Sequence, residues 1–333
     1  MQISPETQLF IREHQTDDVR ALALQARKYP NVDMPTAITQ IAGRQVAAEK
    51  IPSWRDTDDI WYPKHLSLEQ CSSEVTARYK ATLLKGNSLT DLTGGFGIDC
   101  AFLAAKFKSA IYVERQQELC EIAAHNFPIL NLNHINVKNE DGVSYLQAMS
   151  PVDCIFLDPA RRNEHGGKTV AISDCEPDVA ELEELLLNKA GQVMVKLSPM
   201  LDLSLALKEL QHVQEVHIIS ANNECKELLL ILGQASVEEI SIHCVNLPTK
   251  GIQEEQHFVF TREQEQCSEC NYTNALENYL YEPNASLLKA GAFRSIASAF
   301  PVKKLHPNSH LYTSDVLVES FPGRAFHIIS QCS

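Results

Sequence analysis

Between residues 88 and 235 the chain alternates between two patterns. Short apolar runs of strand length are each followed by a stretch in which apolar residues recur at helical spacing. Five such pairs follow one another: 88–93 with 100–107, 110–115 with 116–127, 134–141 with 142–149, 152–159 with 178–187, and 192–199 with 202–213. Strands that alternate with helices in this way predict a parallel sheet with helices on both faces, so we expect an α/β fold.

The last two apolar runs of this region, 215–220 and 227–233, have only six residues between them. So short a connection has no room for a crossover helix. These two strands should therefore be antiparallel neighbours at the end of an otherwise parallel sheet.

The segments on either side follow other patterns. The first eighty residues read as helices, with Pro35 at a first helical position and a capping box at Ser67–Gln70 that opens a further helix. After about residue 235 the sequence indicates strands at 238–247, 256–263 and 325–330 and one helix over 284–300. We thus expect a helical region (1–80), an α/β domain (81–235) and a small α+β domain (236–333).

Composition places the chain among ordinary globular proteins. It has 333 residues, of which 44% are hydrophobic and 22% charged, and no apolar stretch is long enough to span a membrane. The start, MQISPETQLFIREHQ, does not resemble a signal peptide, so we expect a cytoplasmic protein with reduced thiols. Of ten cysteines only Cys267 and Cys270 form a CxxC pair, and without a second pair we expect no metal site.

The net charge of −14 argues against indiscriminate binding to nucleic acid, because phosphate contacts need Lys and Arg. The tail from residue 279 has the opposite sign. Its charged residues are Lys289, Arg294, Lys303, Lys304 and Arg324 against Glu282, Asp315 and Glu319, which gives +2. Either a local surface for an anionic partner or a mixed solvated surface fits this asymmetry.

Candidate chemistry gathers where the predicted strands end, the edge at which open α/β sheets bind ligands. The first strand ends in DLTGGFGID (91–99), whose glycines permit a tight turn and a close backbone approach to a ligand. A dinucleotide-binding fingerprint would need a third glycine where Cys100 stands. Glu114 ends the second strand, where an acid can hold ribose hydroxyls in several nucleotide cofactors. A Gly-rich turn and a solvated acid are the structural alternatives.

These segments resemble the Rossmann-like S-adenosylmethionine-dependent methyltransferases. More narrowly, they resemble a bacterial group of RNA-methyltransferase-like proteins with a helical N-terminal region and a C-terminal THUMP-like, ferredoxin-like domain. The matching stretches are DLTGGFGID, VER, LDPARR, DCEPD, KLSPMLD, YEPNASLLKAGAF, HLYTS and FPGR, from about residue 60 to the end. The antiparallel strand pair also favours this class over dehydrogenases.

The resemblance implies S-adenosylmethionine as cofactor and assigns roles around it. Asp91 would lie near the methionine end, Glu114 at the ribose and Asp141 at the adenine amine. The remaining cofactor residues would be Thr93, Gly94, Gly95, Gly97 and Arg115.

The resemblance also implies the acceptor site. Asp158 and Pro159 stand where methyltransferases of exocyclic amines carry Asp/Asn-Pro-Pro-aromatic, and Arg161 replaces the aromatic residue that would stack on a base. The expected catalytic residues are thus Asp158, Pro159 and Arg161. Candidate contacts to tRNA or ribosomal RNA are Arg162, Lys196, Lys289 and Arg294.

Several alternatives stay open on sequence alone. Lys196 suits either a phosphate contact or an apolar stem with its charge at the sheet edge. The fifth strand, KLSPMLD, has no cysteine, which excludes a covalent thiolate mechanism there. A protein that binds cofactor and RNA without catalysis, a small-molecule or protein methyltransferase and a dehydrogenase are the other readings.

Overall fold

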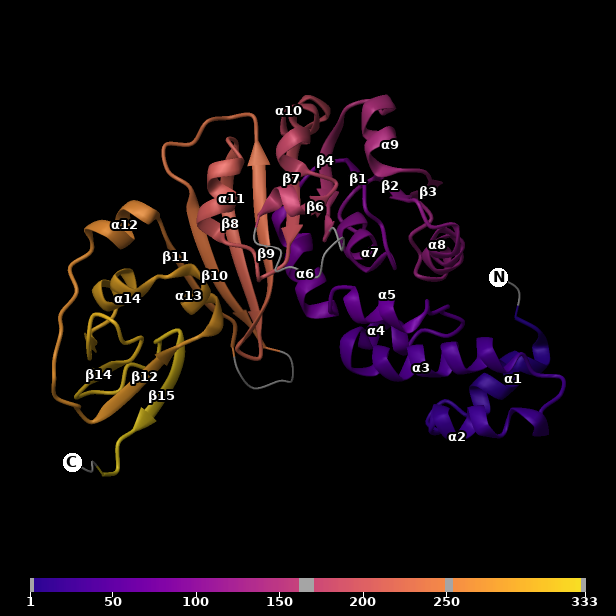
Figure 1. Cartoon of the computed structure of the whole chain (residues 1–333), viewed down its shortest axis with the longest axis horizontal. Coiled ribbons are helices and arrows are strands. Elements are labelled where there is room, and N and C mark those ends of the chain that lie inside the picture. The colour runs from indigo at the N-terminus through magenta and orange to yellow at the C-terminus, as the bar shows by residue number, and fades with distance from the viewer. Residues whose placement is uncertain (1–2, 162–170, 249–253, 331–333) are drawn as a thin grey trace. The chain divides into compact units, whose positions relative to one another are not determined.

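The computed structural model describes residues 3–161, 171–248 and 254–330 (Figure 1). These residues form two compact parts. The first part comprises residues 1–157 with 188–191, and the second part comprises residues 158–187 with 192–333. Among the described residues, none of the helices has the length and apolar character needed to cross a membrane.

The first part begins with a helical region, as expected. Its helices are α1 (Pro5–Glu13), α2 (Val19–Leu24), a 3-10 turn (Ala26–Lys28), α3 (Met34–Lys50), α4 (Pro52–Arg55), α5 (His65–Gln70) and α6 (Glu74–Leu83). The helix predicted to start with a capping box at Ser67 is two helices instead. The Ser73 side chain accepts a hydrogen bond from the Thr76 backbone N–H and starts α6, whereas α5 already ends at Gln70.

Four parallel strands follow, and helices connect them. The strands are β1 (Ser88–Asp91), β2 (Ser109–Glu114), β3 (Ile135–Asn139) and β4 (Val152–Leu157), in the spatial order β4-β1-β2-β3. The helices are α7 (Ile98–Ala104), α8 (Gln117–Ile129) and α9 (Gly142–Ala148). The strand–helix alternation predicted between 88 and 152 is confirmed, and it brings the carboxyl ends of the four strands to one edge.

The core of the first part joins the helical region to this sheet. Trp54 of α4 meets Phe96 edge-on at 5.1 Å between ring centroids, and Tyr62 lies 6.3 Å from the same ring. Phe96 belongs to the Gly-rich turn after β1, and all three rings are buried. The helical region therefore packs directly against the turn predicted to hold a cofactor.

The second part contains the remaining strands of the α/β pattern. It holds β5 (Ala160–Arg161), a 3-10 turn (Ile172–Asp174), β6 (Cys175–Glu176), α10 (Val179–Lys189), β7 (Ala190–Leu197), α11 (Leu203–Glu209), β8 (Val213–Ala221) and β9 (Glu224–Gly233). β9 runs antiparallel to both neighbours, β7 and β8, and lies between them. The predicted antiparallel pair is confirmed, and Asn222 and Asn223 form its turn at φ 52° and 60°.

Two strands extend this sheet beyond β8. β10 (Ser241–Leu247) pairs parallel with β8, and β11 (Gln256–Phe260) pairs antiparallel with β10. The sequence placed both runs in the small C-terminal domain, but β10 is hydrogen-bonded to β8, and β11 is hydrogen-bonded to β10. Hydrophobic pattern identifies a strand without identifying its partner, which is why the sequence missed this pairing.

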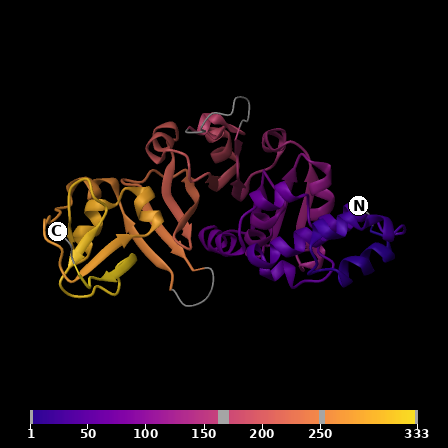
Figure 2. The same cartoon turned by 60° about the horizontal axis from the view of Figure 1, so that its bottom comes forward.

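A separate small sheet ends the chain, seen in yellow in Figure 2. Its order is β13 (Lys303–Lys304), β14 (Tyr312–Ser314), β12 (Tyr279–Pro283) and β15 (Gly323–His327), all antiparallel. The helices of this region are α12 (Arg262–Cys267), α13 (Ala285–Ala290) and α14 (Phe293–Ala299), and α13 packs against β8, β9 and β10 of the larger sheet. The one helix predicted over 284–300 is interrupted at Gly291, whose φ of 75° ends α13.

Candidate cofactor and acceptor sites

The turn after β1 is closed by its own backbone. The Thr93 N–H donates to Asp91 Oδ1 at 3.0 Å, and the Gly94 N–H donates to the Val113 carbonyl at 2.8 Å. The Gly97 N–H donates to the Gly94 carbonyl at 2.9 Å. Asp91 itself is buried with 1% of its surface exposed. The turn is thus fixed against β2 while Asp91 is held beneath it.

Each of the three glycines in this turn meets a separate steric requirement. A Cβ on Gly94 would lie 2.2 Å from the Tyr112 ring, closer than any real contact. Gly95 and Gly97 adopt φ of 55° and 90°, a region that side chains disfavour. The sequence predicted close backbone approach here, and the structure shows how tightly the turn is built.

Glu114, at the end of β2, secures the same turn. Its Oε2 accepts the Gly95 N–H at 2.9 Å and its Oε1 accepts the Gln116 N–H at 2.8 Å. The Tyr112 hydroxyl donates to the Gly95 carbonyl at 2.5 Å. Burial, together with the nearby Glu114, raises the pKa of Tyr112 well above its usual value, so the phenol keeps its proton for this bond.

The end of β3 completes this edge of the sheet. Asp141 caps α9, where its Oδ1 accepts the Ser144 N–H at 2.9 Å. Gly142 lies so close to β1 that a Cβ there would meet the Leu92 carbonyl oxygen at 2.3 Å. Arg115 is exposed just after β2. Parallel pairing therefore gathers Asp91, Glu114 and Asp141 at the carboxyl ends of adjacent strands, as the sequence predicted.

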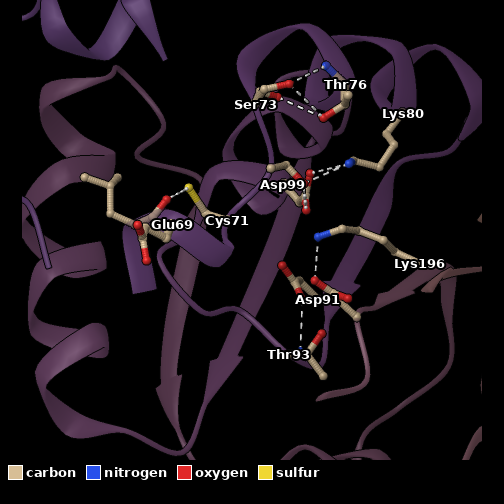
Figure 3. A network of polar contacts seen from close by, with 12 residues as sticks. Glu69, Cys71, Ser73, Thr76, Lys80, Asp91, Thr93, Asp99 and Lys196 are labelled. Carbon is tan, nitrogen blue, oxygen red and sulfur yellow. Dashed lines mark hydrogen bonds and ion pairs between the residues drawn. The ribbon is translucent and has the colours of Figure 1, made fainter. Parts of the chain in front are cut away.

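A buried ionic cluster beside this turn was not predicted. Lys80 of α6 has no exposed surface, and its Nζ lies 3.0 Å from Asp99 Oδ1 at the start of α7. The Lys80 Nζ also donates to Ser72 Oγ at 2.9 Å, and the Ser72 hydroxyl donates to Asp99 Oδ2 at 2.7 Å. Figure 3 shows Lys80 and Asp99 pointing toward each other. Nothing in the sequence pattern distinguishes Lys80 from an exposed helical lysine.

The predicted acceptor residues follow β4 in the chain. Asp158 is the next residue after the buried strand, and its Oδ2 lies 2.5 Å from Lys196 Nζ of β7. Lys196 is largely buried, with 8% of its surface exposed. The structure therefore pairs two residues that the sequence had assigned to catalysis and to substrate contact separately.

The arginines of the same segment are described in part. Arg161 lies in β5, where its backbone pairs with Cys175 of β6. Arg162 lies outside the described residues.

The predicted contacts of the basic tail have partners within the chain. The Lys289 Nζ donates to the Leu201 carbonyl at 2.7 Å, and one Arg294 guanidinium nitrogen donates to the Gln266 carbonyl at 2.8 Å. Arg324 and Lys303 form ion pairs with Glu282 and Glu277. Tyr281 is fully buried and belongs to the core.

The fold and the turn together define a class of protein. A parallel sheet that ends with an antiparallel strand inserted between β7 and β8, a Gly-rich turn after β1 and an acid at the end of β2 are the features of the Rossmann-like methyltransferases. The predicted fold class, including the small ferredoxin-like domain at the C-terminus, is confirmed.

Comparisons with known proteins agree. The family described as protein-L-isoaspartate(D-aspartate) O-methyltransferase matches residues 49–163, and a ferredoxin-like domain family matches residues 279–322. A crystal structure of a "putative methyltransferase" from Porphyromonas gingivalis W83 has 36% sequence identity and a TM-score of 0.85, over 97% of this chain and 81% of that chain. At that identity and coverage, this chain belongs to the same methyltransferase family as the Porphyromonas gingivalis protein.

More distant structures match about half of this chain. An rRNA methylase from Streptococcus thermophilus has 14% identity and a TM-score of 0.36, over 48% of this chain and 96% of that chain. A Streptococcus mutans protein solved in complex with SAH has 15% identity and a TM-score of 0.35, over 48% and 96% of the two chains. Comparison with curated proteins finds no match. Membership of the methyltransferase family confirms S-adenosylmethionine as the cofactor.

Proposed function

We propose that this methyltransferase acts on RNA, tRNA or ribosomal RNA, and that it methylates an exocyclic amine of a base. The observation that carries the proposal is the position of Asp158 and Pro159 directly after β4, with Lys196 Nζ 2.5 Å from the Asp158 carboxylate. A carboxylate and a backbone carbonyl are the acceptors that an amine needs to direct its lone pair.

The turn after β1 fits the adenosyl cofactor. The absence of a Cβ at Gly94 lets the backbone lie close to Tyr112, and Gly95 and Gly97 adopt a positive φ that residues with a side chain disfavour. Asp91 would hold the methionine amine and Glu114 the ribose, since each carboxylate oxygen accepts more than one hydrogen bond. Asp141 would accept from the adenine amine, with Thr93 and Arg115 at the rim.

The bound cofactor supplies an activated methyl group on a sulfonium. The residues of this chain orient the acceptor: Asp158 and the Pro159 carbonyl accept the two N–H bonds of the amine, so that its lone pair faces the methyl carbon. Once the methyl group is transferred, the methylated amine would have to lose one proton, and the Asp158 carboxylate that accepts its N–H bond would take it up. Lys196 positions Asp158 through their ion pair. Arg161 would stack on the base or bind its phosphate.

RNA as the substrate follows from the resemblance of LDPARR to the amine-methyltransferase motif and from the C-terminal domain. We propose that this ferredoxin-like domain is THUMP-like and holds RNA, with Arg294 at the surface. Lys289 and Arg324 contribute less, because their side chains already bond within the chain. Lys289 donates to the Leu201 carbonyl, and Arg324 forms an ion pair with Glu282.

The test uses labelled S-adenosylmethionine, the purified protein and total RNA from cells that lack the gene. Wild type should transfer label into RNA, and Asp158→Ala, which removes both acceptor oxygens, should lower the rate by about 10²-fold or more. Asp58→Ala is the matched control, since it removes the carboxylate of an exposed aspartate in the helical N-terminal region. Label in RNA that is unaffected by Asp158→Ala would contradict the proposed role.

A protein methyltransferase is the second candidate, because the family matched over 49–163 methylates carboxyl groups of proteins. The same assay with total protein as acceptor separates the two. A carboxyl methyl ester releases its label in mild alkali, whereas an N-methyl base retains it. Alkali-labile label in protein, with none in RNA, would replace the RNA proposal. Cofactor binding without transfer to either acceptor would indicate a binding protein.

A further inference from the structure

Three histidines and a glutamate gather on one face of the sheet in the second part. Glu215 and His217 are two residues apart on β8, so their side chains point to the same face. The parallel register places His217 beside His243 of β10, and the antiparallel register places His257 of β11 beside Val245. Residues opposite each other in a register share a face, so all four side chains lie on one side of three adjacent strands.

The side chains approach each other closely. Glu215 Oε2 lies 3.1 Å from His217 Nε2, and His243 Nδ1 lies 3.2 Å from His257 Nε2. The rings of His217 and His243 stack at 4.4 Å between centroids. One ligand-type atom from each of Glu215, His217 and His243 lies within 4.8 Å of the other two.

We propose that Glu215, His217 and His243 form a binding site for a divalent transition-metal ion, with zinc as the best match. Imidazole nitrogens and a carboxylate oxygen are the ligands that zinc takes in three-residue sites. The expectation from the sequence was that no metal binds, because that reasoning considered only Cys267 and Cys270. The three residues proposed here are separated along the chain and meet only through strand pairing.

The geometry needs a modest adjustment to hold an ion. Metal–ligand bonds of about 2.0–2.2 Å in a tetrahedron place ligand atoms roughly 3.3 Å apart. The Glu215–His217 pair already has this separation, and a rotation of His243 toward it would bring in the third ligand. In that rotation His243 would give up its hydrogen bond with Ser241 or with His257 and form a bond to the metal instead. Water or His257 would take the fourth position.

The proposed site is shielded from water on one side and open on the other. His217 has 2% of its surface exposed. Glu215 is about half exposed and gives an ion access from solvent. Its charge offsets part of that of the ion.

The experiment titrates the full chain, carrying no polyhistidine tag and stripped with chelator, with Zn²⁺ by calorimetry and with Co²⁺ by visible absorption. We expect one Zn²⁺ per chain, the intense visible bands of tetrahedral Co²⁺, and their loss when Zn²⁺ is added. Glu215→Gln and His243→Gln should each weaken Zn²⁺ binding by more than about tenfold, since even residues that only support a ligand change affinity by about 10–100-fold. Circular dichroism would establish that both variants fold.

Three controls give each outcome a meaning. His327→Gln changes an exposed histidine of β15 far along the chain and should bind as wild type does. His257→Gln should lose affinity if His257 is the fourth ligand and keep it if water is, and both results fit the three-residue site. A double Cys267→Ser, Cys270→Ser variant should also bind as wild type does. No binding to the wild type, or binding lost only in the cysteine variant, would overturn the proposal.

Discussion

At the scale of single residues, the Gly94 position shows how little freedom the cofactor turn has. Its missing Cβ leaves space that the Tyr112 ring fills, and Tyr112 in turn donates to the Gly95 carbonyl. Glu114 holds the same turn through the Gly95 N–H. One aromatic ring and one carboxylate thus fix the backbone that would contact the ligand, so a change at any of these positions affects both folding and binding.

Gly94→Ala should therefore be destabilising and should weaken cofactor binding. A Cβ placed 2.2 Å from Tyr112 forces the ring or the turn to move, which we expect to cost about 1–3 kcal/mol in the free energy of unfolding. Urea denaturation measures the stability and calorimetry with S-adenosylmethionine measures the affinity.

Gly191→Ala is the matched control for this change. A Cβ at Gly191 would make only an ordinary contact, 3.5 Å from the Asp153 carbonyl oxygen. We expect its stability and cofactor affinity to stay close to wild type. If Gly94→Ala were as stable as Gly191→Ala and bound the cofactor equally well, the turn would be looser than the structure indicates.

At the scale of secondary-structure elements, helices α6 and α7 are joined by the ionic cluster of Ser72, Lys80 and Asp99. The charges are buried, so their hydrogen bonds have to replace water. Because α7 starts directly after the Gly-rich turn, the cluster anchors the far side of the proposed cofactor site to the helical N-terminal region.

Lys80→Met should lower the free energy of unfolding by about 3–5 kcal/mol, because it leaves the Asp99 carboxylate buried without its cation. Adding Asp99→Asn should restore part of that loss, since the remaining buried group is then neutral. Urea denaturation of the two single variants, the double variant and wild type gives the coupling. Lys85→Met, at an exposed lysine nearby, controls for the loss of positive charge. Additive effects of Lys80 and Asp99 would show that they do not interact.

The sequence predicted elements better than it predicted their ends. Between 88 and 233 the hydrophobic period identified the longer strands and the helices that follow them, but it missed the two-residue strands β5 and β6. The helices over 67–79 and 284–300 were each predicted as one, because their apolar spacing continues across the break. Ser73 and Gly291 interrupt them by local means, a side-chain cap and a left-handed backbone, which hydrophobic spacing does not report.

At the scale of the whole molecule, strand order was enough to predict which residues lie at the candidate site. It was not enough to predict the side chains that those residues contact. Asp91, Glu114 and Asp141 end consecutive parallel strands, so the fold class alone places them at one edge. The ion pair between Asp158 and Lys196, the cluster around Lys80 and the histidine group on β8 and β10 depend on contacts between residues far apart in the chain. No pattern in one sequence encodes those contacts, and the proposed metal site is the clearest case.

The last prediction concerns the distribution of charge. The net charge of the molecule is −14, and Lys303 and Arg324 of the basic tail already form ion pairs within the chain. Arg294 is exposed, and among the contacts described its side chain bonds only to the Gln266 carbonyl, so it is the tail's best candidate for a phosphate. Arg294→Glu should weaken binding to tRNA or ribosomal RNA. It should also reduce the slope of log K against log salt concentration by about one, which filter binding at several salt concentrations would measure.

Arg20→Glu, an equal charge reversal at an exposed residue of α2, is the control and should leave that slope unchanged. Equal effects of the two reversals would mean that RNA responds only to overall charge, and the C-terminal domain would then lose its proposed role.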